Sequence, residues 1–215
     1  MTPRILGLVL ATALTAGCDT EQPPIGCPVQ SLEWAATYKP KGPSICSVKV
    51  GEQLGIQKFS TPTGDERLVI KPETLAKLDE QDPERLSYSL GALAKSSDAE
   101  GFCSATDFPP TEKHVPGGDG VAPRDLVYQW NNVRVLATPR APGTQMVADL
   151  TYTENGCTAE YEVWGMWPSV SCENEDGEPD NDICQNAGSI NPDFSVTCEP
   201  TLRLCVPTQR PPSLQ

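Results

Sequence analysis

Two acidic side chains could do chemistry if a hairpin brings them together. Asn155-Gly156 is a strong type I′ turn signal between two segments of alternating hydrophobicity. Closing the turn at these residues places Asp149 directly opposite Glu162 on one face of the hairpin. Two carboxylates at that spacing could serve as the acid and base of a hydrolase, or as part of a cation site. The simpler interpretation is a solvated polar face whose negative charges are offset by Arg134 on the neighbouring segment.

A charge-dense run over residues 173–182 offers the hard oxygen ligands that Ca²⁺ prefers. The run does not fit an EF-hand loop, because that alignment puts Cys172 and Ile183 at the first and last positions, where carboxylates are required. It is similar, over nine residues, to a fragment of a thrombospondin type 3 calcium repeat. We expect a solvated acidic loop between two disulfide cysteines and no resident cofactor, with a Ca²⁺ site as the alternative. The candidate ligands of that site are Asp176, Asp180 and Asp182.

Eight cysteines in the body of the chain predict a disulfide framework. An even number of cysteines in an exported chain is typical of disulfides, and eight suit four bridges. Structural zinc is disfavoured, because Cys-x-x-Cys does not occur and His114 is the single histidine. Pairs that are near in sequence, such as Cys27 with Cys46 and Cys198 with Cys205, are plausible among the 105 connectivities. The predicted disulfide cysteines are Cys27, Cys46, Cys103, Cys157, Cys172, Cys184, Cys198 and Cys205.

Motifs for nucleophilic or phosphate chemistry do not occur in the sequence. Neither Gly-x-x-x-x-Gly-Lys-Ser/Thr nor Gly-x-Ser-x-Gly is found. His114 is expected to be exposed in a loop over residues 111–120, whose glycines and prolines disfavour regular structure. The tryptophans could form a sugar-binding platform, although two of them end a strand and are expected to cap the core. They are Trp34, Trp130, Trp164 and Trp167, of which the last two end the strand.

The amino-terminal segment has the plan of an export signal. Arg4 is its lone side-chain cation, an apolar run of ten residues follows, and small residues end the segment. A membrane-spanning helix needs roughly 20 apolar residues, so this run is too short to cross a bilayer. We therefore expect residues 1–17 to be removed as a signal peptide on export.

The residues that end this segment, Thr15-Ala16-Gly17-Cys18, resemble the lipobox of bacterial lipoproteins. In that family a signal peptidase cuts before the cysteine, whose sulfur carries a diacylglyceryl group. The resemblance implies that Cys18, acylated with chains such as palmitate, holds the protein on the lipid bilayer of the bacterial cell envelope. Two or more acyl chains are enough for stable anchoring without a basic surface. An ordinary secretory signal, with Cys18 unmodified or bridged, is the alternative, and it would leave an odd cysteine.

The remaining sequence divides into a tether, a body and a tail. Residues 18–26 form a short tether, of which Asp19 to Gly26 reach at most roughly 29 Å when fully extended. Residues 27–207 are predicted to form a single β-rich domain, with a possible subdomain split in 109–123. Residues 208–215 are a Pro-rich tail.

We predict a mainly β fold of the α+β class, with one or two short helices and a disulfide framework. Alternation indicates strands over 31–38, 46–59 and 67–71. The carboxyl half is predicted to be an antiparallel meander, in which the alternation changes phase at Asn131-Asn132 through a two-residue hairpin or a β-bulge. Leucine spacing indicates two helices, one opened by Pro72 with Leu75 and Leu78, and one opened by Asp82-Pro83 with Leu86, Leu90 and Leu93.

Composition narrows the class of function. The 215 residues carry a net charge of −13, and removing residues 1–17, with the one cation Arg4, makes it −14. An acidic chain without a cluster of Lys and Arg is not expected to bind nucleic acid. We expect an acidic envelope lipoprotein with a non-enzymatic binding or scaffolding role, facing the periplasm or the cell surface, whose partner is an envelope protein or polysaccharide. The alternatives are a carboxylate-based hydrolase of envelope polymers and a calcium-stabilised adhesive module.

Overall fold

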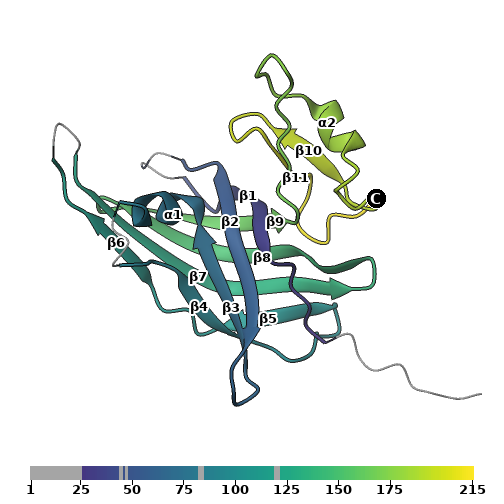
Figure 1. Ribbon diagram of the computed structural model, residues 1–215, viewed down its shortest axis with the longest axis horizontal. Coiled ribbons are helices and arrows are strands. Elements are labelled where there is room, and N and C mark those ends of the chain that lie inside the picture. Colours follow the sequence, from purple (N-terminus) through teal and green to yellow (C-terminus); the bar gives the residue numbers. More distant parts are fainter. Residues whose placement is uncertain (1–25, 44–45, 47, 82–84, 119–121) are drawn as a thin grey trace, which may run out of the picture.

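Figure 1 shows the computed structural model of the protein, which describes residues 26–43, 46, 48–81, 85–118 and 122–215. The predicted signal peptide and Cys18 lie outside these residues. The described residues are mainly in β-strands and include two short helices, so the predicted fold class is confirmed. The strands are β1 (Leu32–Pro40), β2 (Gly51–Ser60), β3 (Glu66–Pro72), β4 (Ser89–Leu93), β5 (Phe102–Thr106), β6 (Thr111–Val115), β7 (Arg124–Thr138), β8 (Ala141–Glu154), β9 (Cys157–Met166), β10 (Val196–Glu199) and β11 (Leu204–Pro207), and the helices are α1 (Glu73–Asp79) and α2 (Asn181–Asn186).

The large sheet closes on itself because β7 pairs with three other strands. The first part of β7 pairs with β6, its later part pairs with β5, and β8 runs along its other edge. The order β5-β4-β3-β2-β1-β9-β8-β7 therefore forms a closed antiparallel sheet, which β6 extends beside β7. Closure leaves few unpaired strand edges, which would otherwise invite pairing with other chains.

A β-bulge allows β7 to make both sets of pairs. The register between β7 and β8 shifts between Asn131 and Arg134, and Asn132 has a φ of 49°. Asn tolerates this left-handed backbone, and a bulge bends the strand that contains it. The change of phase at Asn131-Asn132 is therefore the bulge; the hairpin alternative is wrong, because β7 continues to Thr138.

The hairpin between β8 and β9 is confirmed in its turn and its register. Asn155 and Gly156 have φ values of 50° and 79°, as a type I′ turn requires. Tyr152 pairs with Ala159 and Leu150 pairs with Tyr161, so the apolar face lies inside the sheet. The polar face, which carries the two candidate acids, lies outside.

The first predicted helix is confirmed as α1, whereas the second is wrong. Leu90 and Leu93 belong to β4, which pairs with β3, and Leu86 is exposed. Ser89, Gly91 and Leu93 are buried and the two residues between them are less so. Burial therefore repeats every two residues, as in a strand, although the leucine spacing suggested a helix. Pairing with β3 decides the outcome, because leucines at i, i+4 and i+7 are compatible with either state. The Asp82-Pro83 start lies outside the described residues.

Side chains fill the interior of the closed sheet. Trp34, Tyr128, Trp130 and Tyr161 are all buried there, and Leu75 of α1 packs into the same cluster. The four tryptophans therefore do not form one platform. Aromatic side chains of this size fill a small closed sheet, whose interior is a core.

Residues 169–215 form a separate layer, here called the C-terminal lobe, which contains α2, β10 and β11. Figure 1 shows it beside the β1 and β9 region, outside the closed sheet. Its buried side chains, such as Phe194 and Val206, pack in one cluster with Ala35, Val147 and Met166 of the sheet. Near the end of the chain, Ser213 exchanges two hydrogen bonds with buried Gln145. Among the described segments, neither helix has the length and apolar character that crossing a bilayer requires.

Candidate functional site

The two candidate acids stand opposite each other on the outer face of β8 and β9, as predicted. Asp149 is paired with the Nζ atom of Lys41 at 2.6 Å, and its other oxygen accepts a hydrogen bond from Asn132 at 2.6 Å. Glu162 accepts hydrogen bonds from the Nε of Arg210 at 2.8 Å and from the indole N–H of Trp164 at 2.7 Å. Each carboxylate therefore has its own cation and its own neutral donor.

These contacts hold both acids in the ionised form. Desolvation would raise the pKa of Asp149, but the hydrogen bonds from Lys41 and Asn132 outweigh it and lower the pKa below its usual value. Desolvation would likewise raise the pKa of Glu162, but the hydrogen bonds from Arg210 and Trp164 outweigh it, so this pKa is also lowered. A glycosidase acid needs a raised pKa in order to carry a proton at neutral pH. Both acids are therefore ionised at neutral pH, and neither has the raised pKa that a glycosidase general acid requires.

The predicted role of Arg134 is wrong. Its guanidinium donates hydrogen bonds to Asp98 at 2.7 Å and to Glu100 at 2.8 Å, and it lies over the ring of Phe102. Arg134 follows the bulge and pairs with Ser104 of β5, so its side chain contacts acids in the turn before β5. The bulge thus separates Arg134 from the two acids that it was expected to offset.

The two acids and their partners form a continuous polar surface, here called the charged strip, of Lys41, Asp149, Glu162, Arg210 and Trp164. Trp164 is half-buried, and the Nζ of exposed Lys39 lies 5.0 Å from the centre of its ring. The strip joins strands of the closed sheet to Arg210 of the C-terminal lobe, and both signs of charge remain partly exposed.

We expect Arg210→Ala to lower the free energy of unfolding by up to about 1 kcal/mol near neutral pH, and to have almost no effect near pH 2. The pKa of Glu162 is lowered in the folded protein, so the contact contributes above the unfolded pKa of about 4.3. The contribution disappears as the pH falls through the lower folded value. Urea unfolding of both proteins at the two pH values measures this difference. An equal loss at both values would show that Arg210 acts through packing.

The acidic run forms a loop followed by α2, and its side chains bind within the chain. The carboxylate of Asp180 accepts a hydrogen bond from the N–H of Asp182 and so caps α2, while Glu173 is paired with Arg203 at 2.6 Å. Asn174 orders the turn by accepting hydrogen bonds from the N–H groups of Asp176 and Glu178. The structure thus assigns Asp180 to helix capping and does not gather the three calcium candidates around one point. Within the described part of the chain, three potential ligand atoms come together at the sulfurs of Cys172, Cys184 and Cys205, which are bonded in disulfides.

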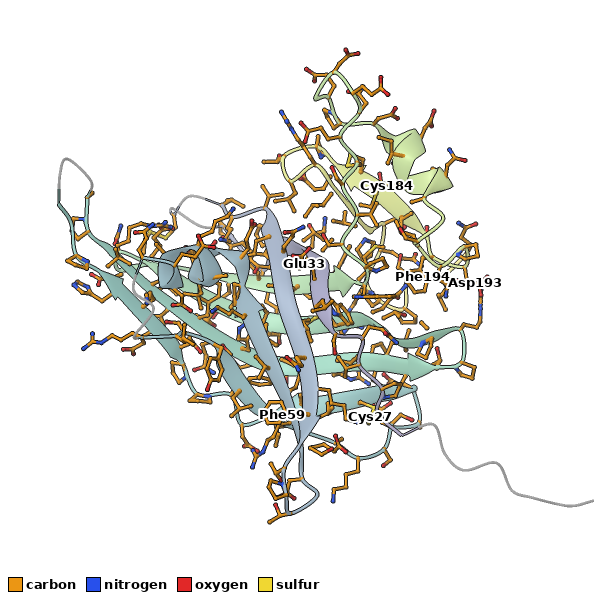
Figure 2. The ribbon with its side chains drawn as sticks, in the orientation of Figure 1. Cys27, Glu33, Phe59, Cys184, Asp193 and Phe194 are labelled. Carbon is orange, nitrogen blue, oxygen red and sulfur yellow. A yellow bond between two sulfur atoms is a disulfide. The ribbon has the colours of Figure 1, made fainter. Side chains whose placement is uncertain are left out.

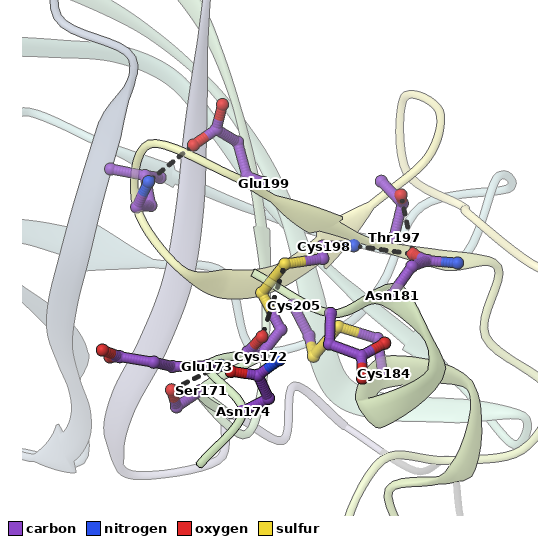
Figure 3. The surroundings of a disulfide bond; sticks show 12 residues. Ser171, Cys172, Glu173, Asn174, Asn181, Cys184, Thr197, Cys198, Glu199 and Cys205 are labelled. Carbon is purple, nitrogen blue, oxygen red and sulfur yellow. Dashed lines mark hydrogen bonds between the residues drawn. A yellow bond between two sulfur atoms is a disulfide. The ribbon is translucent and has the colours of Figure 1, made fainter. Parts of the chain in front are cut away.

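The eight body cysteines form four disulfides, but the two suggested pairings are wrong. Cys27 comes before β1 and Cys46 comes after it, so a strand of nine residues separates them. At about 3.3 Å per residue, that strand is far longer than a disulfide can bridge. Cys198 faces Cys205 in the β10–β11 register, yet each bonds to a cysteine outside that ladder, as Figure 3 shows. The observed pairs are Cys27–Cys103, Cys46–Cys157, Cys172–Cys198 and Cys184–Cys205.

The prediction of a loop around His114 is also wrong. Residues 111–115 form β6, in which Thr111 and Lys113 point inwards while His114 is exposed and contacts the carboxylate of Asp125. The glycines and prolines that suggested a loop begin only after Val115. Lys113 is buried and pairs with Asp79 at 3.0 Å, so β6 connects the sheet to the end of α1.

A buried carboxylate that the sequence analysis missed lies at the start of α1. Glu52 accepts hydrogen bonds from the hydroxyls of Tyr38 at 2.9 Å and Tyr128 at 3.0 Å, and from the N–H of Thr74 at 2.9 Å. The Nζ of Lys49 lies 3.0 Å from the same carboxylate. The first N–H groups of a helix have no partner within the helix, so Glu52 satisfies one that would otherwise be unpaired. The signal for Glu52 in the sequence is its place in the alternation of β2, where it falls in the same phase as the buried residues Leu54 and Ile56.

The phenols around Glu52 stay neutral and donate. Burial raises the pKa of Tyr38 well above its ordinary value, and the negative charge of Glu52 raises it further. Burial and Glu52 raise the pKa of Tyr128 in the same way. The arrangement thus has one anion, one cation and two hydroxyl donors, and it fixes α1 on the closed sheet.

Comparison with known proteins finds one family. The model of the MlpA family matches residues 32–168, which begin with β1 and end just beyond β9. A protein of Myxococcus xanthus named "Putative lipoprotein MlpA" is 36% identical over 228 residues, which cover 98% of this chain and 96% of that protein. No solved structure matches the chain. The family model therefore covers the closed sheet, while the relative also spans the C-terminal lobe.

Proposed function

Because this bacterial lipoprotein belongs to the MlpA family, we propose that acylated Cys18 holds it on an envelope membrane, where its folded body binds a partner without catalysing a reaction. The chain has the lipobox-like residues at Cys18, and its relative is named as a lipoprotein. The short tether would keep the body within roughly 29 Å of the bilayer. An acidic body of this charge is solvated rather than drawn to anionic lipid.

The observation that carries the binding role is the charged strip. Its acids are ionised and paired, and half-buried Trp164 contacts the cation of Lys39 and shares the carboxylate of Glu162 with Arg210. Partly exposed aromatic and Arg side chains are the types that contribute most at protein interfaces. An exposed outer sheet face with both signs of charge suits an envelope protein or a polysaccharide chain as partner. It suits a hydrolase less well, since neither acid carries a proton at neutral pH.

Intact-mass spectrometry of the protein expressed in a bacterium with its own signal tests the anchoring. We expect a mature chain that begins at Cys18, carries a diacylglyceryl group and gains eight alkylated thiols only after reduction. Cys18→Ala is the matched control, and we expect it to lose the lipid mass and leave the membrane fraction. A chain cut elsewhere, without lipid, would contradict the proposal.

The non-enzymatic role has its own test. The purified protein is incubated with glycoside, ester and peptide substrates beside Asp149→Asn and Glu162→Gln. We expect the wild-type chain to show no turnover above that of the two variants. Turnover that both substitutions abolish would establish the hydrolase alternative instead.

A further inference from the structure

The tether leaves the folded body at a defined end of the closed sheet, here called the tether end. Cys27 is fixed there by its disulfide to Cys103 of β5 and by the Nζ of Lys58, which donates a hydrogen bond to the Cys27 carbonyl at 2.9 Å. Lys95, in the turn before β5, lies beside Gly26. Since the tether spans at most roughly 29 Å, this end lies within that distance of any bilayer that holds Cys18. The start of the tether thus limits which surface can meet lipid.

The tether end exposes an aromatic side chain. Phe59 of β2 is 41% exposed, and Figure 2 shows it at the same lower end of the sheet as Cys27. Arg67 stands opposite Phe59 in the β2–β3 register and is half-buried. An exposed ring beside a long cationic side chain is the combination that suits the boundary between lipid headgroups and acyl chains.

The charges at this end differ from those of the chain as a whole. Lys58, Arg67 and Lys95 lie there, whereas the entire chain has a net charge of −13. Of the nearby acids, Glu66 is paired with Lys58 at 3.0 Å, and Asp98 and Glu100, in the same turn as Lys95, are both paired with Arg134. Asp65 accepts a hydrogen bond from Thr63 in the same turn. The tether end is therefore repelled less by an anionic membrane than the acidic remainder is.

We propose that the β2–β3 hairpin at the tether end, with Phe59 and Arg67, is the surface that contacts the phospholipid bilayer. This orientation rests on the proposed anchoring at Cys18 and adds to it the face that meets the lipid. It directs α1 and the opposite end of the sheet, where Leu86 and Tyr88 are exposed, away from the membrane.

Photo-cross-linking tests the orientation, and the chain offers a matched control. Phe59→p-benzoylphenylalanine is compared with Tyr88→p-benzoylphenylalanine, because Tyr88 is an aromatic residue of similar exposure, 49%, near α1. Each full-length lipidated protein is placed in phosphatidylethanolamine–phosphatidylglycerol vesicles and irradiated. We expect phospholipid adducts at position 59 in several-fold excess over position 88, and their loss when Cys18→Ala is added.

The same preparations distinguish a failure of the proposed orientation from a failure of the proposed anchoring at Cys18. The intact mass before irradiation reports whether Cys18 carries lipid and whether all four disulfides are formed, so misfolded variants are recognised. A lipidated, disulfide-bonded protein with equal adducts at both positions, or with none at position 59, overturns the orientation and leaves the anchoring in place. A mass without lipid overturns the anchoring and the orientation with it.

Discussion

Glu52→Leu should lower the free energy of unfolding by about 3–5 kcal/mol, the cost of removing one partner from a buried ion pair. The substitution leaves the cation of Lys49, the hydroxyls of Tyr38 and Tyr128 and the N–H of Thr74 without the acceptor that they share. Leucine fills the volume, so the loss reports the polar contacts. Urea unfolding of the full chain measures it.

Glu52→Gln is the control for this loss. The amide keeps an oxygen acceptor but removes the charge beside Lys49, so we expect a smaller loss of about 1–3 kcal/mol. If the two variants lose the same small amount, water replaces Glu52 and α1 does not depend on it. Loss of helix signal at mild denaturant in Glu52→Leu would place the weakness at α1.

Replacing Cys27 and Cys103 together with alanine should lower the free energy of unfolding by about 4 kcal/mol, because their disulfide closes a long loop in the unfolded chain. The two cysteines are 76 residues apart in sequence. Both are buried, and alanine introduces no polar group there. Denaturant unfolding under non-reducing conditions, with the other three disulfides confirmed by mass, gives the value.

The matched comparison is the removal of Cys184 and Cys205, whose disulfide joins residues only 21 apart. The chain-entropy argument predicts a loss of about 3 kcal/mol for this shorter loop. The test is therefore which of the two variants loses more free energy of unfolding. A larger loss for the short loop would mean that the C-terminal lobe depends on this bond for its packing, beyond the restriction of the unfolded chain.

Local signals predicted those parts of the fold in which several of them agree. Asn155-Gly156 supplies a turn, and the alternation on both sides gives the same register, so the opposition of Asp149 and Glu162 followed correctly. The helix predicted over Leu86, Leu90 and Leu93 rested on the Asp82-Pro83 start and on a leucine spacing that a strand also allows. The pairing of β4 with β3 is a long-range interaction that spacing does not encode.

The partners of the charged strip could not be predicted for the same reason. Lys41 and Arg210 reach Asp149 and Glu162 from segments far away in sequence, and Arg210 belongs to what was predicted to be a Pro-rich tail. Glu52, in contrast, left a signal that was not used. It shares its strand phase with Leu54 and Ile56, both buried, and a carboxylate in an apolar phase must find partners inside.

The four disulfides determine how the molecule would break. The loops closed by two of the disulfides overlap and together span Cys27 to Cys157, and the loops closed by the other two together span Cys172 to Cys205. A single backbone cut within either range therefore leaves the fragments covalently joined. None of the four crosses residues 158–171. A protease that cuts there would leave the C-terminal lobe held by non-covalent packing alone. Between Cys27 and Cys205, residues 158–171 are therefore the one stretch in which a single backbone cut leaves two parts that no disulfide joins.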